Sequence, residues 1–246
     1  MSTWLFDLGN SRLKCAPIGP DGQPGEVVAL DHRGGDWAGP LLRALPARFE
    51  AACVASVAGD ALRVALLEAL VAHCGRISIA TTQRGYDGLR IAYAQPEKLG
   101  VDRFLAMLAA QARGDGAALV CGIGTAITLD LVDADGRHRG GRIAPSPTLM
   151  REALHARAAQ LPALGGDYHA FATDTADALA SGCEGAALAL IERTLEAARD
   201  ALGSTPRLLL HGGGSDALLP RLENANHVPA LVLEGLARWA RAAAAA

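Results

Sequence analysis

The chain has 246 residues, half of them apolar, and a formal net charge of -3. This length is long for one domain and comfortable for two of about 120 residues each. The charge, with only three Trp, three Tyr and four Phe, excludes the basic field and the stacking surface of nucleic-acid-binding proteins.

The first half of the chain predicts a mixed sheet with flanking helices. The apolar pattern indicates strands at 3–8, 12–18, 26–31, 51–56 and 77–81, and a helix at 59–73. A second helix is predicted from Pro96 to Ala112, because proline suits a first helical turn and Gly114 follows the end. We expect Gly114-Asp115-Gly116 to separate a domain at 1–114 from a domain at 115–246.

The second half predicts a domain of the same kind. Three strands are expected between 117 and 144, then helices at 147–159 and 175–201, a strand at 206–210 and a final helix from 229. Because this order mirrors the first half, the chain predicts two related α/β domains.

The turn between the first two predicted strands has the composition of a phosphate-binding loop. Gly9 lets the backbone approach an anion closely, and Asp7 is placed to hold a hydrated divalent cation. Asn10, Ser11 and Lys14 can reach phosphate oxygens. The same turn is also typical of an ordinary hairpin.

A second copy of this layout lies about half a chain further on. The segment from Val120 to Asp130 repeats the order of apolar strand, glycine turn, small hydroxyl residue and second strand. Two such units predict two facing domains, each presenting one phosphate loop to a shared cleft. This is the outline of the actin-like and sugar-kinase-like ATPase superfamily.

An acid and a base stand side by side near the start of the helix predicted from Pro96. Adjacent helical positions point about 100° apart, so Asp102 and Arg103 are expected to serve different neighbours. One interpretation makes Asp102 a base for a substrate hydroxyl and Arg103 a clamp on a carboxylate or phosphate. The other makes Asp102 a helix-dipole acid and Arg103 a solvated or bridging charge.

Three other segments carry weaker signals. Asp130 is expected to end its strand facing solvent, with an indirect ligand of Mg²⁺ as the alternative. His211 is expected to be a structural residue at a strand end, with a neighbour of the adenine or ribose as the alternative. The segment from Gly212 to Ser215 closes one strand and opens a helix, so it is expected to offer free amides to a nucleotide.

The sequence predicts neither a membrane span nor a disulfide framework. No segment offers about 18 uninterrupted apolar residues, and the start, Met1-Ser2-Thr3-Trp4, enters a strand without a basic and apolar leader. We therefore expect a cytoplasmic protein with no membrane partner. Five scattered cysteines without C-x-x-C spacing are expected in the core: Cys15, Cys53, Cys74, Cys121 and Cys183.

Taken together, these segments resemble the type III pantothenate kinase family. The resemblance rests on motifs in a shared order: Asp-x-Gly-Asn-Ser at 7–11 with Lys14, Leu-Gly-Val-Asp-Arg at 99–103, Gly-Thr-Ala-Ile-Thr-Leu-Asp at 124–130, Gly-Gly-Arg-Ile-Ala-Pro at 140–145, the run at 175–182, and His-Gly-Gly-Gly-Ser-Asp at 211–216. Any one motif is ordinary, but their joint order covers most of the chain.

The resemblance implies two ribonuclease H-like (actin-like ATPase) domains, each a mixed sheet flanked by helices, with an interdomain cleft. It implies a homodimeric kinase that transfers the γ-phosphate of ATP to the primary hydroxyl of pantothenate. The product would be 4'-phosphopantothenate, the first intermediate of coenzyme A biosynthesis. The implied cofactors are ATP, Mg²⁺ and a monovalent cation, K⁺ or NH₄⁺.

By position, the resemblance also assigns residues to each ligand. The ATP-binding residues would be Asp7, Leu8, Gly9, Asn10, Ser11, Arg12, Leu13, Lys14 and Thr125, with Asp7 also reaching Mg²⁺ through water. The pantothenate-binding residues would be Tyr93, Gly100, Val101, Asp102, Arg103 and Thr175. Asp102 would be the proton acceptor. Thr175 would come from the neighbouring subunit, and it is also expected to cap its own helix.

One position departs from the family. Gly122 stands where the family usually has an aspartate that is associated with the monovalent cation. Either the cation site is lost or rebuilt from backbone carbonyls, or the cleft is impaired. Two alternatives therefore stay open: a related kinase for another hydroxylated small molecule, and a catalytically weak homologue with an accessory role.

Overall fold

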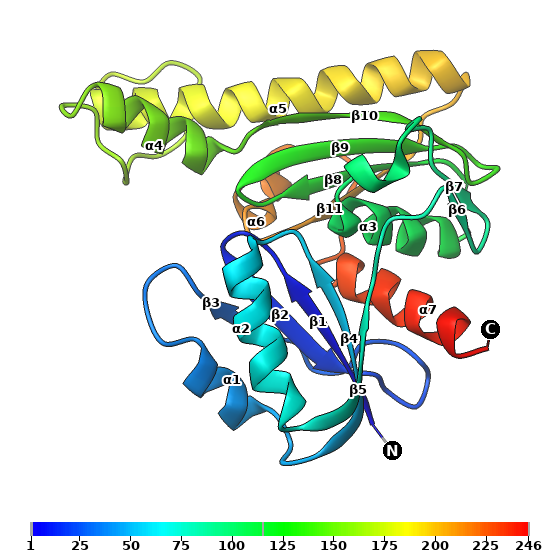
Figure 1. The fold of residues 1–246 in the computed structure, drawn as a ribbon. Helices are drawn as coiled ribbons and strands as arrows, with labels where there is room; N and C mark the ends of the chain where they lie inside the picture. The colour runs from blue at the N-terminus through cyan, green and yellow to red at the C-terminus, as the bar shows by residue number, and fades with distance from the viewer. Residues whose placement is uncertain (1, 115, 246) are drawn as a thin grey trace. The chain divides into compact units, whose positions relative to one another are not determined.

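The computed structural model describes residues 2–114 and 116–245. Asp115, the predicted first residue of the second domain, lies outside them, as do Met1 and Ala246. The described residues form two compact units (Figure 1). One contains the chain up to Gly114 together with Gly136–His138 and the residues from Ala230 onward, and the other contains Gly116–Asp135 and Arg139–Pro229.

The first unit is built on a five-stranded mixed sheet of order β3-β2-β1-β4-β5. Strands β1 and β2 pair antiparallel, as do β2 and β3, whereas β1, β4 and β5 run parallel. The strands are β1 (Thr3–Leu8), β2 (Arg12–Pro17), β3 (Val28–Asp31), β4 (Phe49–Ser56) and β5 (Cys74–Ile79).

Helices cover both faces of this sheet. Alternate strand residues such as Phe6, Leu8 and Val54 pack with α1 (Ala38–Ala44) and α2 (Asp60–Val71), as period-2 side-chain alternation requires. On the sheet's other side lie α3 (Val101–Ala112) and α7 (Leu231–Ala245). These two helices approach so closely that a Cβ at Gly235 would collide with the carbonyl oxygen of Leu105.

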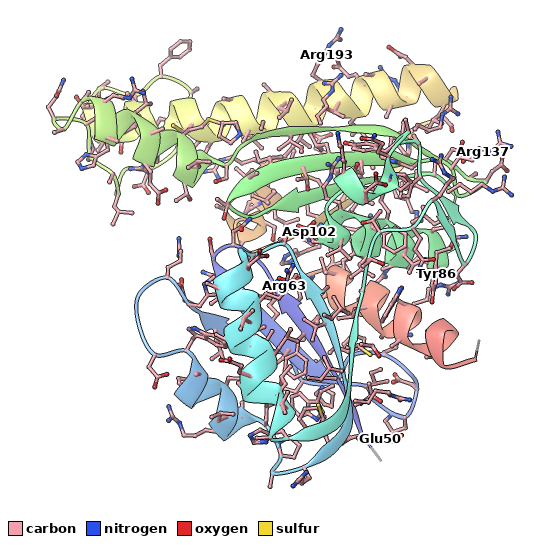
Figure 2. All side chains as sticks on the ribbon, in the orientation of Figure 1. Glu50, Arg63, Tyr86, Asp102, Arg137 and Arg193 are labelled. Carbon is pink, nitrogen blue, oxygen red and sulfur yellow. The ribbon has the colours of Figure 1, made fainter. Side chains whose placement is uncertain are left out.

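A short hairpin and a 3₁₀ turn connect the sheet to α3. The hairpin is β6 (Gly85–Tyr86) and β7 (Leu89–Arg90), and the hydroxyl of Tyr86, labelled in Figure 2, donates to the carbonyl of Trp239 at 2.8 Å. The prediction of one helix from Pro96 was wrong. Pro96–Lys98 is a 3₁₀ turn, after which Leu99 and Gly100 are extended, so the α-helix begins at Val101.

The second unit repeats the topology of the first. Its sheet order, β10-β9-β8-β11-β12, again places the third, second, first, fourth and fifth strands side by side. The strands are β8 (Ala118–Ile123), β9 (Ala126–Val132), β10 (His138–Pro145), β11 (Arg207–His211) and β12 (Ala225–His227). The prediction of two related domains, each with a mixed sheet, is thereby confirmed.

The long helix α5 (Thr175–Leu202) packs on the sheet of the second unit through Ala187, Leu188 and Ile191. Helix α4 (Pro147–Arg157) lies along α5 in Figure 1. The short α6 (Ser215–Leu218) and the 3₁₀ turn η2 (Leu219–Arg221) follow β11. In each unit, a hydrophobic core thus lies between the sheet and the helices that pack on it.

The domain boundary between 114 and 115 stays a prediction. In the structure, the compact units place α7 with the first unit, because this helix packs on α3 and β1 of that unit. Within the described residues, no helix combines the length and the apolar character that crossing a bilayer demands.

Candidate active site

The predicted first phosphate loop is the turn between β1 and β2, and its backbone is held in place. The Gly9 amide donates to the carbonyl of Arg12 at 3.0 Å, and the Gly9 carbonyl accepts from His32 Nε2 at 2.9 Å. Leu8 and Leu13 are fully buried, so only their backbone can face a ligand. The other loop residues are exposed or half-buried: Asp7, Asn10, Ser11, Arg12 and Lys14.

Asp7 interacts electrostatically with one cation and one further carboxylate. It stands directly opposite Lys14 in the β1–β2 ladder. The pKa of Asp7 is raised from 3.8 to about 7, first by burial and then by the charge of Asp102, while Lys14 lowers it. Two neighbouring carboxylates favour either a bound proton or a bound cation. This arrangement suits a carboxylate that works with a metal–nucleotide complex.

The carboxylate of Asp102, labelled in Figure 2, is fixed in the first turn of α3. Its Oδ1 accepts a hydrogen bond from the amide of Arg103 at 2.8 Å. A Cβ at Gly100 would lie 2.6 Å from the same oxygen, so glycine leaves room for this rotamer. The positive end of the helix dipole favours the ionised carboxylate, which is the form that a base needs.

Arg103 points to partners other than Asp102, as adjacent helical positions predict. The residue is only 7% exposed, and its guanidinium donates to the hydroxyl of Tyr93 at 3.4 Å and lies 5.9 Å from the centre of the Tyr93 ring. The expectation of a solvated charge is wrong for this residue, whereas its burial leaves a bridging charge open. Val101 beside it is buried, so it can offer a ligand little beyond its backbone.

His138 completes this group, although no sequence pattern singled it out. Its ring stacks on Tyr93 with centroids 5.8 Å apart and an interplanar angle of 24°, and only 3% of the residue is exposed. The contact joins residues far apart in the chain, which no local pattern reveals. A buried arginine, a tyrosine hydroxyl and an imidazole can together recognise a carboxylate or an amide.

The predicted second phosphate loop is the turn between β8 and β9. The Gly124 amide donates to the carbonyl of Ala126 at 2.9 Å, and Thr125 is exposed at the tip. The carbonyl of Thr125 accepts from the amide of Ser146 at 3.4 Å. Ser146 is itself buried and caps α4 by accepting from the amide of Leu149 at 3.2 Å.

The glycine run after β11 wraps around this second loop. The Gly214 amide donates to the carbonyl of Ile123 at 2.9 Å, and a Cβ at Gly212, whose φ is +94°, would collide with that carbonyl. The Ser215 amide donates to the carbonyl of Gly212 at 3.3 Å. The expectation of free amides is therefore wrong for Gly214 and Ser215, because both bond within the fold.

One face at the end of the second sheet carries polar residues. Thr128, Gly122 and His211 stand opposite one another on β9, β8 and β11. Asp130 lies two residues further along β9 and is only 2% exposed, so the expectation that it faces solvent is wrong. It sits inside the strand, in register with Val120.

Thr175 is exposed as the first residue of α5. The expectation that Thr175 caps this helix is wrong. The cap is Asp174, whose side chain accepts from the amides of Ala176 and Asp177 at 2.9 and 3.0 Å. The Thr175 hydroxyl is therefore not needed for capping.

Between α4 and α5 runs an apolar groove of about 690 Å³. One of its large apolar side chains is open to solvent, with Leu154 43% exposed. The lining residues include Leu149, Met150, Leu154, Leu179 and Cys183. Apolar side chains that line an open groove are a feature of interaction sites.

The described residues contain no group of three or more His, Cys, Asp or Glu side chains that could hold a metal ion. A closed protein cage for a metal is thus absent from this part of the chain. Mg²⁺ bound with a nucleotide needs only one or two carboxylates, because it keeps several waters. Asp7 could supply one such carboxylate.

Comparison with known proteins decides the family. The family model for type III pantothenate kinase matches residues 4–197. A type III pantothenate kinase from Stenotrophomonas maltophilia is 57% identical over 240 residues, covering 98% of each chain. The chain belongs to the type III pantothenate kinase family.

Solved structures of more distant proteins share the fold of this pantothenate kinase family member. A Campylobacter jejuni protein described as a Baf family transcriptional activator has a TM-score of 0.64 at 19% identity, covering 99% of this chain and 100% of its own. An archaeal actin homologue has a TM-score of 0.53 at 11% identity, covering 98% and 100%. The predicted actin-like ATPase fold is confirmed.

Proposed function

We propose that this chain is an ATP-dependent pantothenate kinase. It transfers the γ-phosphate of ATP to the primary hydroxyl of pantothenate and so makes 4'-phosphopantothenate, the first step of coenzyme A biosynthesis. The observation that carries the proposal is the match of residues 4–197 to the type III pantothenate kinase family, and the electrostatic interaction of Asp7 in the first loop with Asp102 at the start of α3 supports it. It occurs in a chain whose family and full-length relatives are pantothenate kinases.

We assign ATP to the two glycine loops. The first supplies the residues from Asp7 to Lys14, and the second supplies Thr125. Lys14 and the loop amides neutralise phosphate charge, which is the main requirement of phosphoryl transfer. Asp7 would hold the Mg²⁺ of Mg-ATP through water, and the ion would supply further neutralisation of phosphate charge. Leu8 and Leu13 act through their backbone, because their side chains are buried.

Asp102 is the proton acceptor in this proposal. Its Oδ1 is held by the amide of Arg103, and the carboxylate oriented in this way accepts the proton of the pantothenate hydroxyl. A base held by the backbone orients the nucleophile as well as deprotonating it. Asp7 and Asp102 interact electrostatically, and a metal–nucleotide complex would offset the repulsion between the two carboxylates.

Arg103 and Tyr93 bind pantothenate. A buried guanidinium presents a rigid fork to a carboxylate, and pantothenate carries one carboxylate. Gly100 and Val101 line the pocket through their backbone, next to Asp102. His138 orients the Tyr93 ring by stacking on it.

We further propose a cytoplasmic homodimer. The apolar groove between α4 and α5, with the exposed Leu154 in its lining, fits a second copy of the chain. Thr175 begins α5 close to the groove residue Ala178, and in the dimer it would reach pantothenate bound to the partner. Sedimentation of the purified chain tests this: Leu154→Asp should shift a dimer to a monomer, and a wild-type monomer would refute it.

The proposed reaction is tested with purified protein, Mg-ATP and pantothenate. Mass spectrometry should detect 4'-phosphopantothenate, and ADP should form in equal amount. A parallel panel of sugars and hydroxylated acids tests the alternative of a related kinase that acts on another small molecule. If no buffer yields phosphorylated pantothenate, the proposal is refuted, whether or not another substrate of the panel is phosphorylated.

A further inference from the structure

The second loop has an unusual arrangement at Gly122. This residue is the last but one of β8 and stands in register with Thr128 on β9 and His211 on β11. These three strands are neighbours in the sheet of the second unit (Figure 1). Residues in register on neighbouring strands share a face of the sheet. The side-chain position of Gly122 is therefore flanked by a hydroxyl and an imidazole.

The imidazole already fills the space that a side chain at 122 would need. A Cβ built on Gly122 would lie 2.9 Å from both Cε1 and Nε2 of His211, and 2.8 Å from Oγ1 of Thr128. Contacts this short require a neighbour to move. The backbone cannot relieve them, because β8 and β11 are paired at five consecutive positions from Arg207 to His211. Any residue larger than glycine must displace the His211 ring.

A monovalent cation, which the family implies, does not fit these residues. Such an ion is held by several oxygen atoms that replace its water. Glycine supplies no carboxylate, and the ring of His211 occupies the space over it. Thr128 contributes one side-chain oxygen at this point, whereas such an ion needs several.

We infer that the imidazole of His211 takes the place of the monovalent cation in this chain, so that Mg-ATP binding and turnover need neither K⁺ nor NH₄⁺. The claim on turnover rests on the proposed function. The claim on Mg-ATP binding rests on the second loop alone. His211 is a positioning residue: it directly precedes Gly212, which wraps around Ile123 of the loop. Its ring always carries at least one N–H donor.

Cation dependence is the first test. Binding of Mg-ATP is measured by titration calorimetry, and phosphorylation of pantothenate by ADP release, in choline, sodium, potassium and ammonium chloride at one ionic strength. We expect Kd and kcat to agree within about twofold across the four salts. A Kd or kcat that improves about tenfold or more in K⁺ or NH₄⁺ overturns the inference. Binding in choline without any pantothenate turnover supports it and refutes the proposed function instead.

Variants supply the second test. His211→Ala should raise the Kd for Mg-ATP about tenfold, close to 1.4 kcal/mol, with KM for pantothenate unchanged, and Gly122→Ala should do the same by displacing the ring. The double variant that carries Gly122→Asp and His211→Gly should regain Mg-ATP binding only when K⁺ is added. His73→Ala, a histidine of the other unit, is the control. Circular dichroism checks folding, and a folded His211→Ala that binds Mg-ATP normally overturns the inference.

Discussion

Replacing Asp7 with asparagine should stabilise the ligand-free protein at alkaline pH while abolishing phosphoryl transfer. The pKa of Asp7 lies near 7 in the folded chain, against an ordinary value of 3.8 that the unfolded chain retains. Below 3.8 both states hold the proton, so the carboxylate costs nothing. As the pH rises toward 7 the unfolded chain loses its proton first, and the free energy of unfolding falls. Above 7 the full cost remains.

The size of the effect follows from the pKa difference. A shift from 3.8 to about 7 corresponds to about 4 kcal/mol at most, at 1.36 kcal/mol per unit. Asp7 is half-buried rather than fully enclosed, and solvent screens its repulsion from Asp102, so we expect about 2 kcal/mol. Asparagine keeps the shape and removes the charge. The gain should therefore appear near pH 8 and vanish near pH 4.

Urea denaturation at a series of pH values measures this directly. Asp7→Asn should raise the free energy of unfolding near pH 8 by about 2 kcal/mol, and near pH 4 it should match the wild type. The exposed Asp135→Asn is the control and should change stability by under about 0.5 kcal/mol at either pH. A variant that is destabilised equally at both pH values would refute the reasoning on Asp7.

Three further substitutions test the packing and the site. Gly235→Ala should lower stability by about 2 kcal/mol or more in thermal denaturation, because the new methyl collides with the carbonyl of Leu105; an unchanged melting temperature would contradict the close approach of α3 and α7. Asp174→Ala should cost about 1 kcal/mol in urea denaturation, since it removes the cap of α5, and a neutral result would contradict the assigned cap. Arg103→Lys should raise KM for pantothenate about tenfold with KM for ATP unchanged, because lysine lacks the planar fork. An equal rise in both constants would argue against a carboxylate clamp.

Local patterns were enough to predict most of the fold. The strands at 3–8 and 12–18 and the glycine turn between them appear where apolar alternation and Gly9 place them. The repeat at Val120 predicted the duplicated sheet. Short elements such as β6 and β12 were missed, because two or three residues carry no periodicity. The start of α3 was misplaced, since Pro96 also suits a 3₁₀ turn.

The candidate site could be predicted only in part, because its contacts join distant segments. Asp7 and Asp102 each stood out locally, but their electrostatic coupling depends on tertiary packing. The same holds for His138, which stacks on Tyr93 across a long stretch of chain. Gly122 was interpreted as a missing carboxylate, whereas the structure shows that its small size makes room for His211.

The central claim is that Asp102 deprotonates pantothenate, and one measurement tests it most directly. Single-turnover formation of 4'-phosphopantothenate is followed for wild type and Asp102→Asn, with the Kd for Mg-ATP measured on the same samples. We predict a rate about 10²–10⁴ times lower in the variant with Mg-ATP still bound. A variant that transfers phosphate within about tenfold of the wild-type rate would contradict the account.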